Sequence, residues 1–268
     1  MPLVVRFLNI KHIHYLHDIQ LLHPSGLIFL GEENIIKSFY AKFYQFLNRM
    51  LFNELIVISP SNWLLNLHFS QGFFKNSSTS QIYNPLDYEF TEDVKGKRKI
   101  DKFKFLYVGQ IEKHKGIEDA IVAFKSVSAP SDIFKIIGEG SNLTNLKKHE
   151  SQKIIFTGKL SKKDVLREMR DANCLLIPSS CYENSPGVYY EAMSVNLPVL
   201  GSDFGGLADL INEFGGYKIY LKGGGLESAI LEVKKSINEN PIKLKTDLFK
   251  ENVSVRNYFK KIKKLILS

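Results

Sequence analysis

Short apolar runs alternate with amphipathic stretches along the second half of the chain, and the alternation becomes regular at Lys104. Apolar runs bounded by turn residues are typical of buried strands. The strands expected on this pattern are Phe105–Val108, Phe134–Ile137, Lys153–Phe156, Cys174–Ile177, Val199–Gly201 and Lys218–Leu221. Helical spacing between them predicts helices near Gly116–Ser126, Asn142–His149, Lys162–Asp171, Gly187–Ser194, Ala208–Asn212 and Leu226–Ile237. Strands alternating with helices predict a parallel, doubly wound α/β sheet covered on both faces.

The pattern before Lys104 is less regular. An apolar run at the start is typical of a strand, and His14–Gln20 has the pattern of a strand end followed by a polar turn. Further along, the sequence predicts strands at Leu55–Ser59 and Gln81–Tyr83, and a helix between them that starts at Trp63. The stretch Glu89–Lys102 is charged and poor in large apolar residues, which favours an interdomain linker.

Two segments have the spacing of amphipathic helices without a place in this alternation. Glu33–Leu51 has a broad apolar face, with Lys37, Lys42 and Arg49 among or beside it. We expect this helix to face the core, and the alternative is a basic amphipathic surface that touches lipid headgroups. The tail Asp247–Leu267 is predicted as one basic amphipathic helix.

Composition places the chain among ordinary folded proteins. Its 268 residues are 44% hydrophobic and 24% charged, which allows one large domain or two modest ones. The two cysteines, Cys174 and Cys181, form no disulfide or metal framework, and this favours a reducing, cytoplasmic location. No apolar run approaches the roughly 20 residues that span a bilayer, so we expect a soluble protein.

A formal charge of +8 indicates an anionic partner. Nucleic acid, an anionic membrane surface and a phosphate-bearing substrate all satisfy this condition. The basic residues are dispersed, and the sequence has no zinc spacing, no RNA-binding aromatic signature and no helix-turn-helix pattern. We therefore expect no nucleic acid partner.

The stretch from Pro178 to Phe204 has the pattern of a ligand site. Ser185 and Pro186 predict a helix start as N-cap and first helical residue, and Asn196 predicts the left-handed end. Glu183 lies in the preceding loop and Glu191 in the helix. The two carboxylates suit an acid/base pair or hydrogen bonds to sugar or ribose hydroxyls. The structural alternative is that the helix dipole favours Glu191 and that Glu183 is an exposed loop residue.

Three further strand-to-helix turns contain residues suited to phosphate binding. They are Val108-Gly109-Gln110 followed by Lys115, then Gly138 in Ile137–Ser141, and then Gly158-Lys159. Each turn alone is weak evidence, because a glycine can serve the turn and a lysine the surface. Parallel strands place their carboxyl ends at one edge, where open α/β sheets bind ligands. The sequence therefore predicts a continuous crevice at that edge.

Taken together, these motifs resemble the GT-B-fold glycosyltransferases of family 4, the glycosyl transferases group 1 proteins. The resemblance rests on FLYVGQIEKHKG, IIGEGSNL, FTGKLSKKDV and ENSPGVYYEAM followed by NLPVLGSDFGGLADLI. It continues upstream through HDIQLLHPSG, VISPSNW and IYNPLD. The resemblance implies two Rossmann-like domains and retaining transfer of a sugar from a nucleotide-diphosphate sugar, without a metal or other cofactor. It also implies a sugar or lipid-linked acceptor, a role in cell-surface polysaccharide or glycoconjugate synthesis, and peripheral contact with the inner membrane face.

The same resemblance implies a role for individual residues. Glu191 would hold the ribose hydroxyls, Glu183 the donor sugar, and Lys115 the diphosphate. Backbone groups of Pro186, Gly187 and Val188 would meet the sugar and diphosphate, and those of Lys159 and Leu160 would meet the base. Gly109 and Gly138, from the strand-to-helix turns, are counted with the donor-binding residues. His17 would lie on the acceptor side near the reacting carbon. Gln110 stands where many family members have an arginine, so Lys115 would neutralise more of the phosphate charge.

The family's amino-terminal strand and glycine-rich loop normally precede the His-Asp motif by a long stretch, whereas here that motif lies at His17-Asp18. The expected domains are thus a truncated amino-terminal one at residues 1–95, a donor-binding one at 96–245, and a carboxy-terminal helix at 246–268 that returns toward the first. A partner polypeptide that completes the first domain is one expectation. A nucleotide-sugar-binding module or split-enzyme half without activity of its own, and a sugar phosphorylase or epimerase, are the alternatives.

Overall fold

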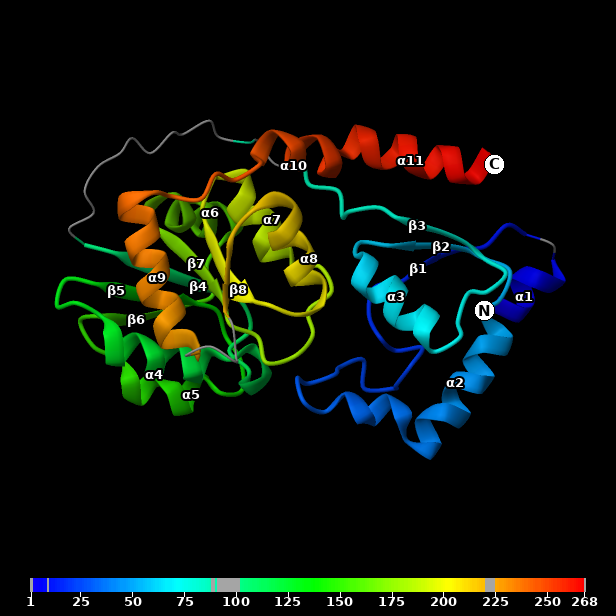
Figure 1. The fold of residues 1–268 in the computed structure, drawn as a ribbon, viewed down its shortest axis with the longest axis horizontal. Helices are drawn as coiled ribbons and strands as arrows, with labels where there is room; N and C mark the ends of the chain where they lie inside the picture. Colours follow the sequence, from blue (N-terminus) through cyan, green and yellow to red (C-terminus); the bar gives the residue numbers. More distant parts are fainter. Residues whose placement is uncertain (1, 9, 88–89, 91–101, 220–224, 268) are drawn as a thin grey trace. The chain divides into compact units, whose positions relative to one another are not determined.

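The computed structural model describes residues 2–8, 10–87, 90, 102–219 and 225–267, and the chain folds into two compact units (Figure 1). Unit 1 comprises the chain up to Asp87, the short segment Cys181–Ser185 and the carboxy-terminal segment from Glu251. Unit 2 comprises the stretch that ends at Ser180 together with Pro186–Lys250. The expected boundary at residues 95–96 and nearly all of the expected linker lie outside the described residues.

Unit 2 contains the predicted parallel sheet. Its strands are β4 (Lys104–Val108), β5 (Ile133–Ile137), β6 (Ile154–Gly158), β7 (Cys174–Ile177), β8 (Val199–Ser202) and β9 (Tyr217–Ile219). Their order across the sheet is β6-β5-β4-β7-β8-β9, and each neighbouring pair is parallel. The doubly wound α/β prediction is therefore confirmed. The last two residues of the strand expected at Lys218–Leu221 lie outside the described residues.

Helices cover both faces of this sheet because its strands have apolar side chains on both sides (Figure 1). One face, which includes Phe105, Phe134 and Leu176, packs against α4 (Ile117–Val127) and α9 (Gly225–Glu239). Gly201 points to the other face, where its missing side chain leaves room for α8 (Gly205–Phe214). Unit 2 also contains α5 (Leu143–Leu146), the 3-10 turn η3 (Lys147–His149), α6 (Lys162–Asp171) and α7 (Gly187–Ser194).

Unit 1 is built on a smaller parallel sheet of β1 (Ile13–Tyr15), β2 (Ile56–Ser59) and β3 (Ser78–Gln81), with β2 in the middle. The helix α3 (Asn62–Ser70) follows β2, as predicted. Two predictions were wrong. The opening apolar run is a helix, α1 (Pro2–Phe7), since a short apolar run does not distinguish strand from helix. The third strand occupies the polar Ser78–Gln81 instead of Gln81–Tyr83, because its pairing with β2 sets its register.

The predicted helix Glu33–Leu51 is broken at Ser38 into the 3-10 turn η1 (Glu33–Lys37) and α2 (Phe39–Leu51). Ser38 has an extended backbone, and its hydroxyl accepts a hydrogen bond from the Ala41 N–H and donates one to the Ile35 carbonyl. A serine that caps the second helix in this way ends the first.

The core-facing prediction for this helix was also wrong, because α2 buries its polar side. Its buried residues are Ala41, Gln45 and Asn48. The Gln45 side-chain amide donates to the carbonyls of Leu22 and Ile36, and the Asn48 amide donates to Leu21. Buried loop carbonyls need donors, and these two side chains supply them. The apolar side of α2 is consequently exposed.

The carboxy-terminal segment forms two helices, α10 (Thr246–Val253) and α11 (Val255–Leu267), where the sequence predicted one. A bridge between Ser254 and Leu86 and a hydrogen bond from the Leu86 N–H to the Val253 carbonyl mark the junction. Among the helices that the structure describes, none has the length and apolar character needed to cross a membrane.

The buried His68 and the half-buried His14 make the stability of unit 1 depend on pH. Burial lowers the pKa of His14 and of His68 from 6.5 to about 4, and the neighbouring His12 lowers that of His14 further. The unfolded chain therefore binds protons that the folded unit excludes between those two pKa values. The stabilising effect of excluding these protons is fully present above pH 6.5 and is lost as the pH drops toward 4. The loss is up to about 3 kcal/mol for the buried His68 and smaller for the half-buried His14, which solvent screens.

We expect His68→Phe to flatten this pH dependence, since phenylalanine keeps a ring beside Phe73 and Phe74 and has no proton to bind. The variant loses the hydrogen bond between the His68 Nδ1 and the Leu64 carbonyl, so the slopes are compared and not the absolute values. Urea unfolding followed by the fluorescence of Trp63, the only tryptophan and part of unit 1, measures the slope. An identical slope in the variant and the wild type would contradict the assignment.

Candidate functional site

The topology of unit 2 places its switch point between β4 and β7. The chain runs from β4 outward to β5 and β6, then returns to the other side of β4 and continues from β7 to β8 and β9. Ligands of open α/β sheets bind outside the carboxyl ends of the strands at such a point. The loops that leave β4 and β7 there contain Gly109–Gly116 and Pro178–Pro186, so the predicted motifs lie where the topology predicts a site.

The turns after β4, β5 and β6 are joined to one another through their backbones. The Gly109 N–H donates to the Ile137 carbonyl at 3.1 Å, and the Gly138 N–H donates to the Gly158 carbonyl at 3.0 Å. A Cβ on Gly138 would lie 1.8 Å from the Gly109 carbonyl oxygen, at a positive φ of 144°. Only glycine fits at position 138. The two hydrogen bonds and this close approach join the three predicted turns along one edge of the sheet.

The Glu112 carboxylate links the turn after β4 to the turn after β5. Glu112 accepts hydrogen bonds from the Ser141 N–H at 2.7 Å and from its hydroxyl at 2.6 Å. These two bonds lower the pKa of Glu112 below its ordinary value. The sequence interpretation missed this pair, although a glutamate after one glycine turn and a serine after the next is a detectable signal.

Lys115 lies in the turn that links β4 to α4. It ends the 3-10 turn η2 (Lys113–Lys115) and is half-buried. Gly116 follows in the left-handed conformation, and a Cβ there would lie 1.9 Å from the Pro178 carbonyl oxygen at the end of β7. The Ser180 N–H and hydroxyl both donate to the His114 carbonyl. The loops on the two sides of the switch point are therefore held together within unit 2.

The helix α7 presents its first turn at this edge. Pro186 is the N-cap and provides no side-chain hydrogen bond, so the prediction of Ser185 as N-cap was wrong. Nothing lies within 4 Å of the place where a Cβ on Gly187 would be. The N–H groups of a helix's first turn lack partners inside the helix and attract anions. The predicted left-handed helix end is confirmed at Asn196, which has a φ of 54°.

Glu191 lies in the second turn of α7 and is half-buried, and the first turn contains no acidic residue. The favourable effect of the helix dipole is confined to the first turn. Glu191 is therefore not explained as a first-turn residue that the helix dipole favours. The helix itself is anchored by the Tyr189 hydroxyl, which donates to the carbonyls of Leu210 and Gly215 at 3.0 and 2.8 Å.

Lys159 and Leu160 follow β6 at the far end of the same edge. They stand between Gly158, which has a positive φ of 72°, and Ser161, whose hydroxyl caps α6 by accepting from the Asp164 N–H. Lys159 is exposed and Leu160 half-buried. The backbone of this pair is thus fixed on both sides, as a contact to a ligand through backbone groups requires.

The two other predicted residues, His17 and Glu183, belong to unit 1. The Asn184 side-chain amide donates to the His17 carbonyl at 2.7 Å, and the Ser61 hydroxyl donates to the Asn184 Oδ1 at 2.5 Å. The segment with Glu183 is thus tied to the end of β1, where His17 is exposed.

Tyr182 anchors the same segment on its other side, a feature that the sequence interpretation missed. Its ring stacks on Trp63 with centroids 5.3 Å apart and an interplanar angle of 5°. Its hydroxyl donates to the Glu33 carboxylate at 2.8 Å. Burial is the main cause and this hydrogen bond the second cause that raise the pKa of Tyr182 to about 12, so the phenol stays protonated. Glu183 is therefore flanked by two anchored neighbours, Tyr182 and Asn184.

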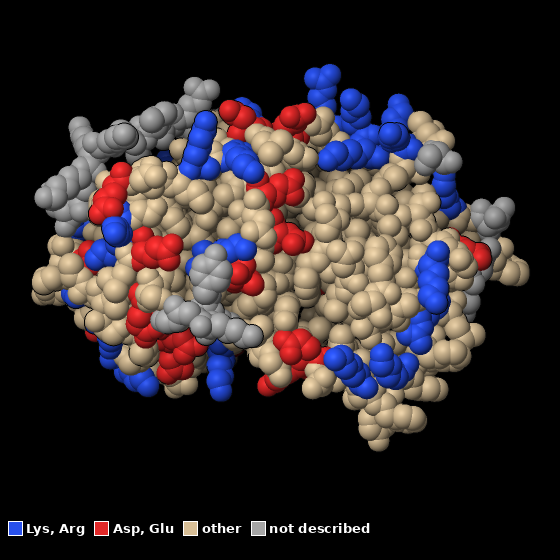
Figure 2. Space-filling model, in the orientation of Figure 1, with Lys and Arg blue, Asp and Glu red and all other residues tan. Residues whose placement is uncertain are grey.

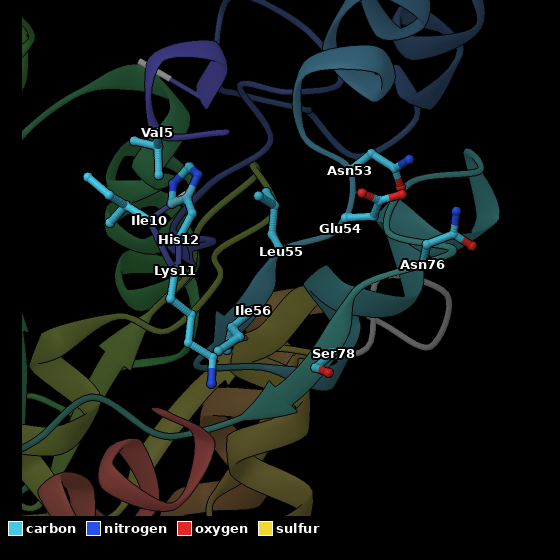
Figure 3. Close-up of a pocket in the computed structure, with 10 residues that line it drawn as sticks. All are labelled: Val5, Ile10, Lys11, His12, Asn53, Glu54, Leu55, Ile56, Asn76 and Ser78. Carbon is cyan, nitrogen blue, oxygen red and sulfur yellow. The ribbon is translucent and has the colours of Figure 1, made fainter. Parts of the chain in front are cut away.

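A pocket of about 470 Å³ lies elsewhere in unit 1 (Figure 3). It is lined by residues of α1, the segment before β1, the turn after α2 and the start of β3, among them Lys11, His12 and Glu54. These residues lie at the amino ends of the strands, opposite to the end where such sheets bind ligands. We therefore place the candidate site at the edge of unit 2 and not in this pocket. Across the described residues, no group of three or more His, Cys, Asp or Glu side chains is arranged to hold a metal ion.

The family model of the glycosyl transferases group 1 proteins matches residues 89–245, more than half of the chain. An uncharacterized glycosyltransferase of Methanocaldococcus jannaschii is 23% identical over 97% of this chain and 69% of its own length. A glycogen synthase of Mycobacterium tuberculosis is 30% identical over 40% of this chain and 28% of its own length.

Solved structures show the same fold. Anabaena HepE in complex with UDP superposes with a TM-score of 0.77 at 17% identity, over 99% of this chain and 74% of that one. Its complex with UDP-glucose gives a TM-score of 0.74. A sucrose-phosphate synthase from Thermosynechococcus elongatus gives 0.72 at 17% identity, over 99% of this chain and 70% of that one.

Proposed function

Because the chain belongs to the glycosyl transferases group 1 family, it is a glycosyltransferase with the GT-B fold, and we propose that it moves a hexosyl group from a nucleoside-diphosphate sugar to a sugar or lipid-linked acceptor with retention of configuration. We place this transfer in the cytoplasmic synthesis of a cell-surface polysaccharide or glycoconjugate. The assignment of this chain to family 4 of the glycosyltransferases is part of the same proposal.

The observation that carries the proposal is the joined edge of unit 2 at the switch point between β4 and β7. The lysine turn ending at Gly116, the Gly138 turn and the first turn of α7 follow the carboxyl ends of β4, β5 and β7 in one sheet, which supports a single ligand site there. A nucleoside-diphosphate sugar needs donors for its phosphates and acceptors for its hydroxyls. The edge offers N–H groups and Lys115 for the first, and the Glu191 carboxylate for the second.

In the proposed complex, Lys115 and the N–H groups of Gly187 and Val188 neutralise the diphosphate, while Glu191 accepts hydrogen bonds from the ribose. Backbone groups beside Lys159 and Leu160 contact the base. Glu183 holds the donor sugar, and His17 lies near the reacting carbon on the acceptor side. Anomeric retention is tested by following the anomeric proton of the product by NMR during the reaction.

Catalysis in this scheme consists of positioning and of stabilising the leaving diphosphate. As the glycosidic carbon–oxygen bond of the donor breaks, negative charge develops on the β-phosphate oxygen, where Lys115 and the α7 N–H groups stabilise it. The charge that a metal ion would supply comes from the chain itself in this proposal. Activity that persists in the presence of a chelator is the corresponding expectation.

We expect Glu191→Ala to weaken binding of the nucleotide sugar by about 1–3 kcal/mol, because the ribose hydroxyls lose the charged acceptor of their hydrogen bonds. Isothermal titration calorimetry measures the loss directly. Glu232→Ala, which removes an exposed glutamate from α9, is the matched control and should bind like the wild type. Unchanged donor affinity in Glu191→Ala would remove Glu191 from the site.

The alternative, a nucleotide-sugar-binding module or one half of a split enzyme, has one observation in its favour. The chain covers 69% of the Methanocaldococcus relative and 74% of HepE, so parts of both proteins have no counterpart in it. Donor binding by calorimetry without turnover on any acceptor would support this alternative, and a partner polypeptide that restores turnover would identify the chain as one half of a split enzyme.

A further inference from the structure

The outward face of α2 is a row of large apolar side chains that no other described part of the chain covers. It consists of Phe39, Tyr40, Phe43, Phe46, Leu47 and Met50, which are between 44% and 84% exposed. Their spacing of one, three and four residues places them on one side of the helix, over about 17 Å of its length. We name this surface the α2 patch. Single exposed apolar residues are common, but a contiguous row of this size indicates an interaction surface.

The exposure of the α2 patch is built into the fold. Rotating α2 to bury the patch would break the hydrogen bonds that Gln45 donates to Leu22 and Ile36 and the bond that Asn48 donates to Leu21. The Tyr44 hydroxyl, which donates to the Gln20 carbonyl, fixes the same orientation. The polar side of α2 therefore donates hydrogen bonds to backbone carbonyls of unit 1, and the apolar side remains available for a partner.

Three cations line one flank of the α2 patch and converge on the turn at Gln71-Gly72. Lys42 Nζ donates to Gln71 Oε1 at 2.9 Å, and Arg49 Nη1 donates to the Gln71 carbonyl at 3.0 Å. A Cβ on Gly72 would lie 3.8 Å from Arg49 Cδ and 3.9 Å from Lys75 Cε. No acidic residue occurs within α2. In Figure 2, blue basic side chains border the tan surface where Figure 1 draws α2.

An apolar row beside a basic flank fits the headgroup region of an anionic lipid bilayer. Phenylalanine, leucine and methionine enter the acyl boundary, a tyrosine hydroxyl stays at headgroup level, and lysine and arginine meet the lipid phosphates. We propose that the α2 patch docks unit 1 on an anionic bilayer, with the axis of α2 parallel to the membrane plane. This docking goes beyond glycosyl transfer and does not depend on it.

A second copy of the chain is the competing occupant. Antiparallel pairing of two α2 patches would bury their apolar rows but would also bring together the like-charged flanks with Lys42, Arg49 and Lys75. Parallel pairing would separate these flanks but would give them no opposite charge from the partner's flank. An anionic bilayer supplies the opposite charge together with the apolar environment. Charge complementarity therefore favours the bilayer.

Sedimentation of the intact chain with vesicles tests the proposal. We expect binding to phosphatidylcholine vesicles that contain about one quarter phosphatidylglycerol, weaker binding to pure phosphatidylcholine, and a decrease with added salt. The triple variant Phe39→Ser, Phe43→Ser, Phe46→Ser should bind at least about tenfold more weakly, because three large apolar groups no longer enter the membrane. Lys42→Gln with Lys75→Gln should lower binding mainly at low salt.

The control is Val122→Ser with Leu231→Ser, which removes two apolar residues of unit 2 that are 52% and 50% exposed and should leave vesicle binding unchanged. Trp63 fluorescence and far-UV circular dichroism confirm that each variant is folded. Wild-type binding that the triple variant retains, or no binding by the wild type, would overturn the proposal. A wild-type dimer in analytical ultracentrifugation that the triple variant abolishes would assign the α2 patch to a second copy instead.

Discussion

Lys115→Ala is expected to lower kcat/KM for the nucleotide sugar by about 100- to 1,000-fold, the usual effect of removing one group that stabilises a developing oxyanion. The side chain starts from a turn whose backbone is fixed by the close approach of Gly116 to Pro178 and by the two bonds from Ser180 to the His114 carbonyl. The substitution removes a charge and leaves these backbone contacts of the turn in place. Initial rates at varied donor concentration give the ratio.

The binding of fragments of the donor separates a phosphate contact from a general loss of structure. Lys115→Ala should weaken a nucleoside diphosphate far more than the free nucleoside, because the removed charge faces the phosphates. Lys113→Ala is the matched control, since it removes an exposed lysine from the same 3-10 turn and should leave both affinities unchanged. Equal losses for the diphosphate and the nucleoside in Lys115→Ala would contradict the role assigned to Lys115.

Gly138→Ala is expected to destabilise unit 2 by about 3 kcal/mol or more and to abolish donor binding. The added Cβ would meet the Gly109 carbonyl oxygen at 1.8 Å, at a φ of 144° that alanine rarely adopts. Relief of the clash requires the β4 and β5 turns to separate, which also disrupts the edge that presents the phosphate contacts. Urea unfolding followed by far-UV circular dichroism measures the loss.

Gly187→Ala is the control for this substitution. Nothing lies within 4 Å of its Cβ position, and its φ is ordinary, so stability should not fall. If Gly138→Ala and Gly187→Ala were equally stable, the close approach of the Gly109 and Gly138 turns would not hold in solution. A loss of donor affinity in Gly187→Ala at full stability would support the proposed contact between the diphosphate and the start of α7.

The fold of unit 2 was predictable because its strands are buried on both faces. A strand such as Cys174–Ile177 has no polar position, so its apolar run and its bounding turns define it. The turns at Gly109 and Gly138 were predictable for a related reason, since only glycine tolerates the approach that joins them. What the sequence could not indicate is that these turns are bonded to each other, because that depends on strand order.

Unit 1 was harder to predict because its local patterns conflict with its packing. The periodicity of α2 was correct, but burial of Gln45 and Asn48 depends on distant loop carbonyls that no local pattern reveals. The polar strand Ser78–Gln81 is likewise set by pairing with β2. Tyr182 stacks on Trp63 across a long sequence separation, so its anchoring of the Glu183 segment was not detectable either.

Calorimetric titration of the intact chain with a panel of nucleoside-diphosphate sugars tests the central claim most directly. We predict saturable binding of one molecule per chain for at least one member of the panel, with the affinity reduced in both Glu191→Ala and Lys115→Ala and retained in Glu232→Ala and Lys113→Ala. A folded chain that binds no member of the panel, or that binds with the same affinity in all four variants, would contradict the claim that the edge between β4 and β7 is the donor site.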